Sequence, residues 1–216
     1  MRLLLLGATG PTGLHVLGRT LDEGHTVTAL VRSPQKLPRP DEGSRDRLTV
    51  LVADVADRRD VARAAAGQDA VLCTIGAGRN LTSDIIGRTA AALIPAMREA
   101  EVGRLVFLSS YGVVVGDTAD GASLSQRFFY RTLLRKIYAD KARADRELLA
   151  SGLDVTVVHP VRLTNGPFTG DYRAVEHARF TGMPGMSRAD VAHFMVSQLQ
   201  DPTWSRRVAV LAPPSK

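Results

Sequence analysis

The stretch Leu3-Leu4-Leu5-Leu6-Gly7-Ala8-Thr9-Gly10-Pro11-Thr12-Gly13 decides the fold of this chain. Its four leucines form an apolar run that is typical of a strand buried on both faces. The residues that follow, 14–21, have the apolar spacing of a helix. The sequence therefore predicts a strand, a tight glycine-rich turn and a helix in direct succession.

The three glycines of this turn have the spacing G-x-x-G-x-x-G. A turn between a parallel strand and a helix points backbone N–H groups and the positive end of the helix dipole at an anion. We expect Gly7 to form the turn, Gly10 to allow close approach of a phosphate and Gly13 to pack the helix on the strand. Because Pro11 has no N–H, the contacts to a dinucleotide pyrophosphate are predicted for Thr9, Gly10, Thr12 and Gly13.

Composition narrows the class of protein. The 216 residues carry a net charge of +6, but Lys and Arg alternate with Asp and Glu along the chain. This pattern favours an anionic cofactor or substrate over nucleic acid. No stretch approaches the ~18 apolar residues that span a membrane, and Gly7 interrupts the leucine run too early for a signal-peptide core. We expect a soluble, cytoplasmic protein with no metal site, whose oligomeric state the sequence leaves open.

Apolar runs alternate with helical segments along the rest of the chain. Strands are predicted at residues 26–31, 48–52, 69–75, 104–108, 154–158 and 208–211, and helices at 57–66, 83–100, 126–150 and 187–200. Continuously apolar strands of this kind belong to a parallel sheet covered on both faces. We therefore predict an α/β protein with a single-domain, doubly wound Rossmann fold over residues 1–216 and a mainly parallel sheet. Ligands bind such sheets at the carboxyl ends of the strands.

The end of the second strand indicates which dinucleotide binds. An NAD site places an acidic residue there, whereas the 2′-phosphate of NADP calls for a cation. Here Arg32 is followed by Ser33 and Lys36, so we predict NADP(H), although a solvated loop residue is the alternative for Arg32. Asp54, followed by Val55, is expected beside the adenine, where its carboxylate either accepts the amino proton or caps a turn. The lone cysteine, Cys73, lies in an apolar run and is expected to be structural.

Several motifs along the chain carry a family resemblance. They are Gly7-Ala8-Thr9-Gly10-Pro11-Thr12-Gly13, Val27-Thr28-Ala29-Leu30-Val31-Arg32, Gly67-Gln68-Asp69-Ala70-Val71, Arg79-Asn80-Leu81, Ser151-Gly152-Leu153 and Thr169-Gly170-Asp171-Tyr172. The chain resembles the atypical short-chain dehydrogenase/reductases of the NAD(P)H-binding, NmrA-like kind, and within them the biliverdin-IXβ reductase/flavin reductase group. The resemblance implies an NADPH-dependent reductase of a planar conjugated acceptor, such as a flavin, a quinone or a linear tetrapyrrole. Its acceptor pocket would come from the C-terminal third of the chain.

The resemblance also implies positions around the nicotinamide. Ile75 and Gly76 would flank one side of the ring, and Pro160 and Val161 the other. Ser110 stands where the family has its catalytic serine, with Ser109 beside it. A hydroxyl at this place hydrogen-bonds the acceptor or orients the nicotinamide amide.

The remaining catalytic candidates depart from the family pattern. Tyr138 and Lys141 are three residues apart, whereas ordinary short-chain dehydrogenases space this pair by four; a helix still presents both on one face. Packing for Tyr138 and a surface charge for Lys141 are the alternatives. His159 precedes Pro160, while flavin reductases have Pro-Pro-His, so the acid role does not transfer and a scaffold role stays open. Arg162 can instead attract a carboxylate or phosphate on the acceptor.

Further expectations concern the pocket and the function as a whole. Aromatic side chains would wall an apolar acceptor pocket or simply pack in the core: Tyr111, Phe128, Phe129 and Tyr130. Two alternatives to a reductase remain on sequence grounds. One is a non-catalytic NADP(H) sensor or partner-binding protein of NmrA-like type, and the other is a redox-neutral isomerase or cyclase.

Overall fold

The computed structural model describes residues 1–39, 41–78, 80, 83–111, 135–178, 180 and 184–214. Its helices are α1 (Pro11–Asp22), α2 (Arg58–Ala65), α3 (Ile85–Glu99), α6 (Arg135–Leu149) and α7 (Arg188–Ser197). The strands are β1 (Arg2–Leu6), β2 (Thr26–Val31), β3 (Leu48–Val52), β4 (Ala70–Cys73), β5 (Arg104–Leu108), β6 (Asp154–Pro160), β7 (Arg162–Thr164), β8 (Arg173–Val175), β9 (Gly185–Ser187) and β10 (Arg207–Ala212).

The described strands form one large twisted sheet in the order β3-β2-β1-β4-β5-β6-β10-β8, beside a small sheet of β7 and β9. Neighbouring strands of the large sheet run parallel, except that β8 is antiparallel to β10. The strand order reverses between β1 and β4, which makes this the switch point of a doubly wound sheet. The predicted Rossmann fold with a mainly parallel sheet is confirmed.

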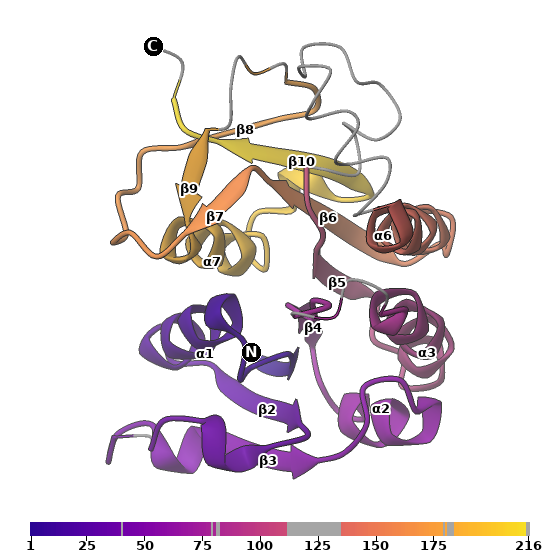
Figure 1. Cartoon of the computed structure of the whole chain (residues 1–216). Helices are drawn as coiled ribbons and strands as arrows, with labels where there is room; N and C mark the ends of the chain where they lie inside the picture. The colour runs from indigo at the N-terminus through magenta and orange to yellow at the C-terminus, as the bar shows by residue number, and fades with distance from the viewer. Residues whose placement is uncertain are drawn as a thin grey trace.

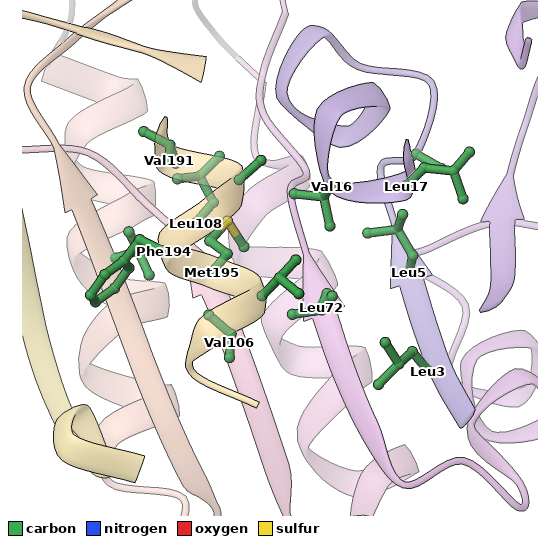
Figure 2. Close-up of a cluster of buried hydrophobic side chains, with 14 of the residues drawn as sticks. Leu3, Leu5, Val16, Leu17, Leu72, Val106, Leu108, Val191, Phe194 and Met195 are labelled. Carbon is green, nitrogen blue, oxygen red and sulfur yellow. The ribbon is translucent and has the colours of Figure 1, made fainter. Parts of the chain in front are cut away.

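Two layers of helices cover the sheet, with α1 and α7 on one face and α2, α3 and α6 on the other (Figure 1). Figure 2 shows the first layer, in which Val16 of α1 and Met195 of α7 pack over strand side chains such as Leu5, Leu72 and Val106. All five of these side chains are buried. Because both faces of the central strands are covered, their sequences are apolar at every position and not only at alternate ones.

The structure differs from the predicted elements in ways that matter for the site. β6 continues through Pro160 and therefore includes His159, which the sequence places after the strand. α3 begins at Ile85 with Asp84 as its N-cap, although the Ser83 hydroxyl still accepts a bond from the Ile85 N–H at 3.3 Å. The expected helix at 126–150 is described only from Arg135, since 126–134 lie outside the described residues.

None of the described helices is long and apolar enough to cross a membrane. The Cys73 side chain is fully buried at the end of β4, and this burial raises the pKa of its thiol to about 12. A thiol in this state is unreactive, in agreement with a structural role.

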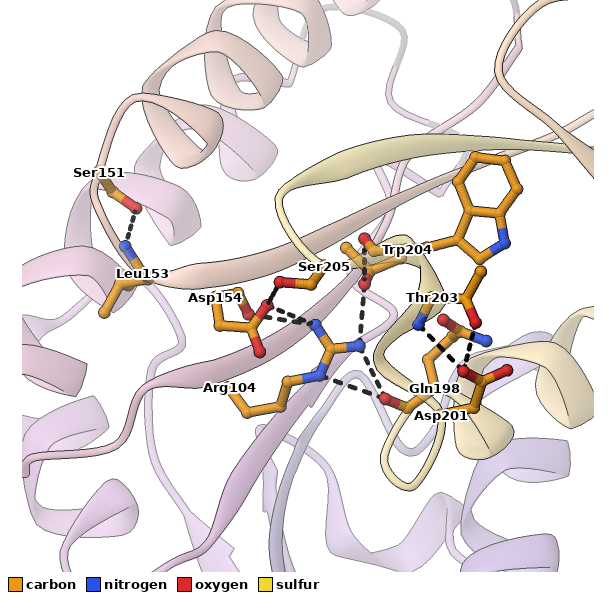
Figure 3. Close-up of polar contacts among 10 residues, drawn as sticks. Arg104, Ser151, Leu153, Asp154, Gln198, Asp201, Thr203, Trp204 and Ser205 are labelled. Carbon is orange, nitrogen blue, oxygen red and sulfur yellow. Dashed lines mark hydrogen bonds and ion pairs between the residues drawn. The ribbon is translucent and has the colours of Figure 1, made fainter.

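A polar cluster fixes the amino-terminal ends of β5 and β6 (Figure 3). The guanidinium of Arg104 donates to Asp154 Oδ1 at 3.1 Å and to the Gln198 carbonyl at 2.7 Å. It also donates to the Thr156 hydroxyl at 2.9 Å. Through these contacts one side chain joins β5, β6 and the end of α7. Only 12% of the Arg104 side chain is exposed, so its partners have little water to replace it.

We predict that Arg104→Met lowers the free energy of unfolding by about 2 kcal/mol, because it removes the charged donor of the half-buried Asp154 carboxylate and of the Gln198 carbonyl. Arg2 is the matched control: its ion pair with Asp69 has the same 3.1 Å separation but is 63% exposed on the arginine side. Arg2→Met should cost less than about 1 kcal/mol. Urea unfolding measures both, and equal losses would contradict the argument from burial.

Candidate functional site

The predicted site residues gather at one edge of the sheet. Gly7 follows β1, Arg32 follows β2 and Asp54 follows β3, while Ile75 and Ser109 follow β4 and β5. Because these strands are parallel, all five positions lie at the carboxyl edge on both sides of the switch point. This edge is where doubly wound sheets bind dinucleotides.

The glycine turn is built by close backbone packing. Gly7 has a φ of +87°, and a Cβ there would lie 2.7 Å from Thr74 Oγ1. A Cβ on Gly13 would lie only 2.0 Å from the Gly7 carbonyl oxygen. The structure thus agrees with the turn role of Gly7 and the packing role of Gly13. Sequence reasoning missed Thr74, whose hydroxyl donates to the Leu6 and Gly7 carbonyls at 3.1 Å each.

One expectation for this turn needs correction. The Gly10 N–H donates to the Gly7 carbonyl at 2.9 Å and therefore closes the turn instead of facing a phosphate. Gly10 is the N-cap of α1, makes no side-chain cap bond, and is followed by Pro11 at the first helical position. The first turn of α1 also contains no acidic residue. The N–H groups of Thr12 and Gly13 thus remain for an anion, and a pyrophosphate fits this helix start.

The residues predicted near the adenosine half lie on exposed turns. Arg32 is exposed directly after β2, and among the described residues no carboxylate pairs with it. Ser33 precedes the short 3-10 helix Pro34–Lys36, which ends in the exposed Lys36. Asp54 Oδ1 accepts the Ala56 N–H at 3.0 Å and so caps a turn, the second of its two predicted roles. Val55, next to it, is buried.

Open space follows β4. Ile75 is half-buried and Gly76 is exposed, and a Cβ built on Gly76 would meet no atom within 4 Å. Beyond it, Gly78 has a φ of +59°. Arg79 and Leu81 of the family motif lie outside the described residues. There is therefore free space beside Gly76, at the place predicted for one side of the nicotinamide.

A buried polar network joins the ends of β5 and β6 to α6. The Ser109 hydroxyl donates to Asp145 Oδ2 at 2.9 Å, and His159 Nε2 lies 2.8 Å from the same oxygen. All three residues are less than 6% exposed. Because a carboxylate oxygen only accepts, Nε2 carries the proton in this pair. His159 thus has the hydrogen-bonded scaffold arrangement that the sequence left open, and Ser109 faces α6. Sequence reasoning missed Asp145, since nothing in its spacing distinguishes it from a helix surface acid.

The other catalytic candidates surround this network. Ser110 follows Ser109, and its enclosed hydroxyl has no hydrogen-bond partner in the described part of the chain. Tyr138 and Lys141, both half-buried, precede Asp145 on the same face of α6. Burial lowers the pKa of Lys141, while the charge of Asp145 opposes this shift. A partly dehydrated cation therefore lies one helical turn from a buried carboxylate.

The segment after β6 lies beside a ring pair. Pro160 and Val161 are buried, and the Pro160 carbonyl accepts the Tyr111 N–H at 3.0 Å. Tyr111 packs edge to face against Phe180, with ring centroids 5.1 Å apart, and its hydroxyl donates to the Ala178 carbonyl at 2.6 Å. Phe128, Phe129 and Tyr130, the other predicted pocket aromatics, lie outside the described residues. Arg162 is exposed on β7.

The chain matches a known protein family over most of its length. Residues 7–202 match the model of a family described as NAD(P)H-binding. The chain belongs to this NAD(P)H-binding family. The match begins at the first glycine of the turn and takes in all the candidate residues named above.

Individual members and structures are similar over nearly the whole chain. A Bacillus subtilis protein named as an uncharacterized sugar epimerase, YhfK, is 28% identical over 214 residues, which is 96% of this chain and 92% of the relative. The fold matches a short-chain dehydrogenase/reductase from Veillonella parvula in complex with NADP, with a TM-score of 0.81, 18% identity and coverage of 99% and 95%. It also matches the anaerobillin reductase ChuY from Escherichia coli, with a TM-score of 0.79, 22% identity and coverage of 100% and 98%.

The glycine turn of this family member gives a test of the cofactor site. Gly13→Ala should lower the free energy of unfolding by about 3 kcal/mol and weaken NADP⁺ binding, because its Cβ overlaps the Gly7 carbonyl. Gly18 is the matched control on α1, since its Cβ would meet no atom within 4 Å. Gly18→Ala should stabilise the protein by about 0.5–1 kcal/mol. Thermal unfolding with and without NADP⁺ measures both effects, and equal behaviour of the two variants would refute the packing argument.

Proposed function

We propose that this protein is an NADPH-dependent reductase of a planar conjugated acceptor such as a flavin or quinone. Bound NADPH would supply a hydride from its nicotinamide, and the acceptor would also take up one proton. The observation that carries the proposal is that Ser110 follows β5 at the same sheet edge as the glycine turn, across the switch point, and that Lys141 lies one turn before Asp145, which bonds to Ser109 and His159 at this edge. A dinucleotide that spans this point has its pyrophosphate at the turn and its nicotinamide near β4 to β6.

The preference for NADPH rests on the end of β2. The exposed Arg32 and Lys36 offer two cations, and no acidic side chain occupies the first position after the strand. A guanidinium binds a phosphate through two parallel hydrogen bonds, whereas it leaves the ribose hydroxyls of NADH without an acceptor. One carboxylate oxygen of Asp54, Oδ1, accepts the Ala56 N–H within its own turn, so the other, Oδ2, would accept from the adenine amino group.

We expect Arg32→Gln to raise the dissociation constant of NADPH by about 10- to 100-fold, because a charge-assisted bidentate contact is lost. The dissociation constant of NADH should change by less than about twofold. Arg45→Gln is the control, since Arg45 is equally exposed but precedes β3, at the opposite edge of the sheet. Fluorescence titration measures these constants, and a parallel loss for NADH would remove the phosphate role.

The chain's own groups would polarise and orient the acceptor. The Ser110 hydroxyl is enclosed and has no described partner, so a hydrogen bond to an acceptor carbonyl or ring nitrogen would satisfy it. The Lys141 ammonium would contact the nicotinamide ribose or the acceptor. Pro160 and Val161 would exclude water from one side of the ring, and Tyr111 with Phe180 would supply an apolar wall in the C-terminal third.

Ser110→Ala should lower the rate of hydride transfer about tenfold, which corresponds to one neutral hydrogen bond of about 1.4 kcal/mol. NADPH consumption with flavin, quinone and linear tetrapyrrole acceptors measures this rate. Tight NADPH binding without turnover on any of these acceptors would favour a sensor protein instead. A product of unchanged mass with NADPH unspent would favour a redox-neutral isomerase, the reaction class in the name of the Bacillus subtilis relative.

The proposal includes a small-molecule partner and a cytoplasmic location, and it assigns no nucleic acid or membrane to the protein. Among the described residues no group of three or more acidic, histidine or cysteine side chains is arranged to hold a metal ion. Hydride transfer from a nicotinamide needs no metal, because the positioned cofactor carries the chemistry.

A further inference from the structure

Asp145 joins three segments through a buried polar side chain, beside the apolar packing and strand pairing that also hold them together. Its Oδ2 accepts the Ser109 hydroxyl from the end of β5 at 2.9 Å and lies 2.8 Å from His159 Nε2 near the end of β6. Asp145 itself belongs to α6. A side chain of this kind, 5% exposed and shared between two strand ends, sets the relative positions of all three segments.

Each of these segments carries a group used in the proposed reduction. Ser110 is the residue after Ser109, and Pro160 is the residue after His159. On α6, Lys141 is one turn before Asp145, and a rise of 1.5 Å per residue puts it about 6 Å further along the helix axis. The two hydrogen-bond partners of Asp145 therefore lie one residue from the candidate hydroxyl and one residue from the nicotinamide wall, and Asp145 itself lies one turn from the candidate cation.

The charge of Asp145 faces polar groups at the ends of two strands and on its own helix. These are Ser109 from β5, His159 from β6 and Lys141 from its own helix. A carboxylate this deeply buried is costly unless hydrogen bonds and an opposite charge compensate it. Asp145 Oδ1 and His159 Nδ1 are enclosed and have no hydrogen-bond partner among the described residues. The hydrogen-bonding groups of this network are therefore only partly satisfied, which costs stability. Since an apolar contact would hold the strands as well, stability alone does not explain a buried carboxylate at this position.

We propose that Asp145 is a positioning residue for the reduction, which fixes Ser110 and Pro160 through Ser109 and His159 and supplies a counter-charge one helical turn from Lys141. This inference rests on the proposed function. It assigns no proton transfer to Asp145 or His159, because both side chains are buried and their hydrogen bond joins them to each other. The geometry and the charge at the carboxyl edge would then both depend on the buried carboxylate of Asp145.

Three variants separate these two contributions. Asp145→Ala removes the geometry and the charge, and Ser109→Ala removes only the link to β5. Asp145→Asn keeps an accepting oxygen but removes the charge. Asp154→Asn is the matched control, because Asp154 is a carboxylate at the opposite end of β6 that accepts from Arg104 and Ser205. It should lower the thermal stability and leave the chemistry unchanged.

We expect Asp145→Ala and Ser109→Ala to lower kcat by roughly 10- to 100-fold, because small displacements of reacting groups have effects of this size. The dissociation constant of NADPH should change by less than about threefold, since the glycine turn is untouched. For Asp145→Asn, the pKa of Lys141 falls further, so the basic limb of the kcat profile moves to lower pH. Unchanged kcat in all three variants, with a loss of thermal stability like that of Asp154→Asn, would overturn the inference and leave Asp145 purely structural.

A second readout does not depend on turnover. The neutral amine fraction of Lys141 is measured from the rate at which acetic anhydride modifies it as pH is varied, with mass spectrometry of the peptide. Loss of the Asp145 charge should raise this rate at neutral pH in Asp145→Asn but not in Asp154→Asn. If the wild-type protein reduces no acceptor but Asp145→Asn still raises the labelling rate of Lys141, the proposed function is wrong and the coupling between Asp145 and Lys141 is supported. If the labelling rates are the same, the coupling fails whatever the activity.

Discussion

The rest of the structure depends on the contact between Gly13 and the Gly7 carbonyl oxygen. Only a residue without a Cβ lets the first turn of α1 approach β1 so closely, since any larger side chain would place an atom 2.0 Å from that oxygen. This approach sets the start of α1 over the strand end, and α1 in turn packs against α7 to form one layer of the core. The candidate anion site and the fold thus depend on the same backbone contact.

Much of the fold could be predicted because each local signal agreed with the global pattern. β2, β3 and β5 begin and end where the apolar runs do, and Ser187 caps α7 by accepting the Asp190 N–H, as its sequence suggests. The three-residue strands β7, β8 and β9 could not be predicted, since their pairing depends on distant partners and their sequences carry no period. β6 extends two residues beyond the predicted 154–158, because Pro160 pairs with Leu211 of β10 and its carbonyl still accepts the Tyr111 N–H.

The candidate site was predictable to a different extent at its two halves. The cofactor half follows from residue types that backbone geometry demands, such as Gly7, and from the cation at the end of β2. In the other half, the role of Ser109 depends on a residue 36 positions away in the chain. No spacing rule predicts such a contact, because it forms only where α6 packs against the ends of β5 and β6. The two ends of β6 are held by different side chains: Arg104 bonds to the amino end, and Asp145 bonds to His159 near the carboxyl end.

The burial of Cys73 has a consequence for how the protein meets oxidants. A thiol whose pKa is about 12 is almost never a thiolate, and the thiolate is the form that peroxides and disulfides attack. As the chain has no second cysteine, it has no means of forming an internal disulfide. Under oxidative stress the folded protein would therefore keep its cysteine thiol reduced, since neither a thiolate nor a second cysteine is available to react.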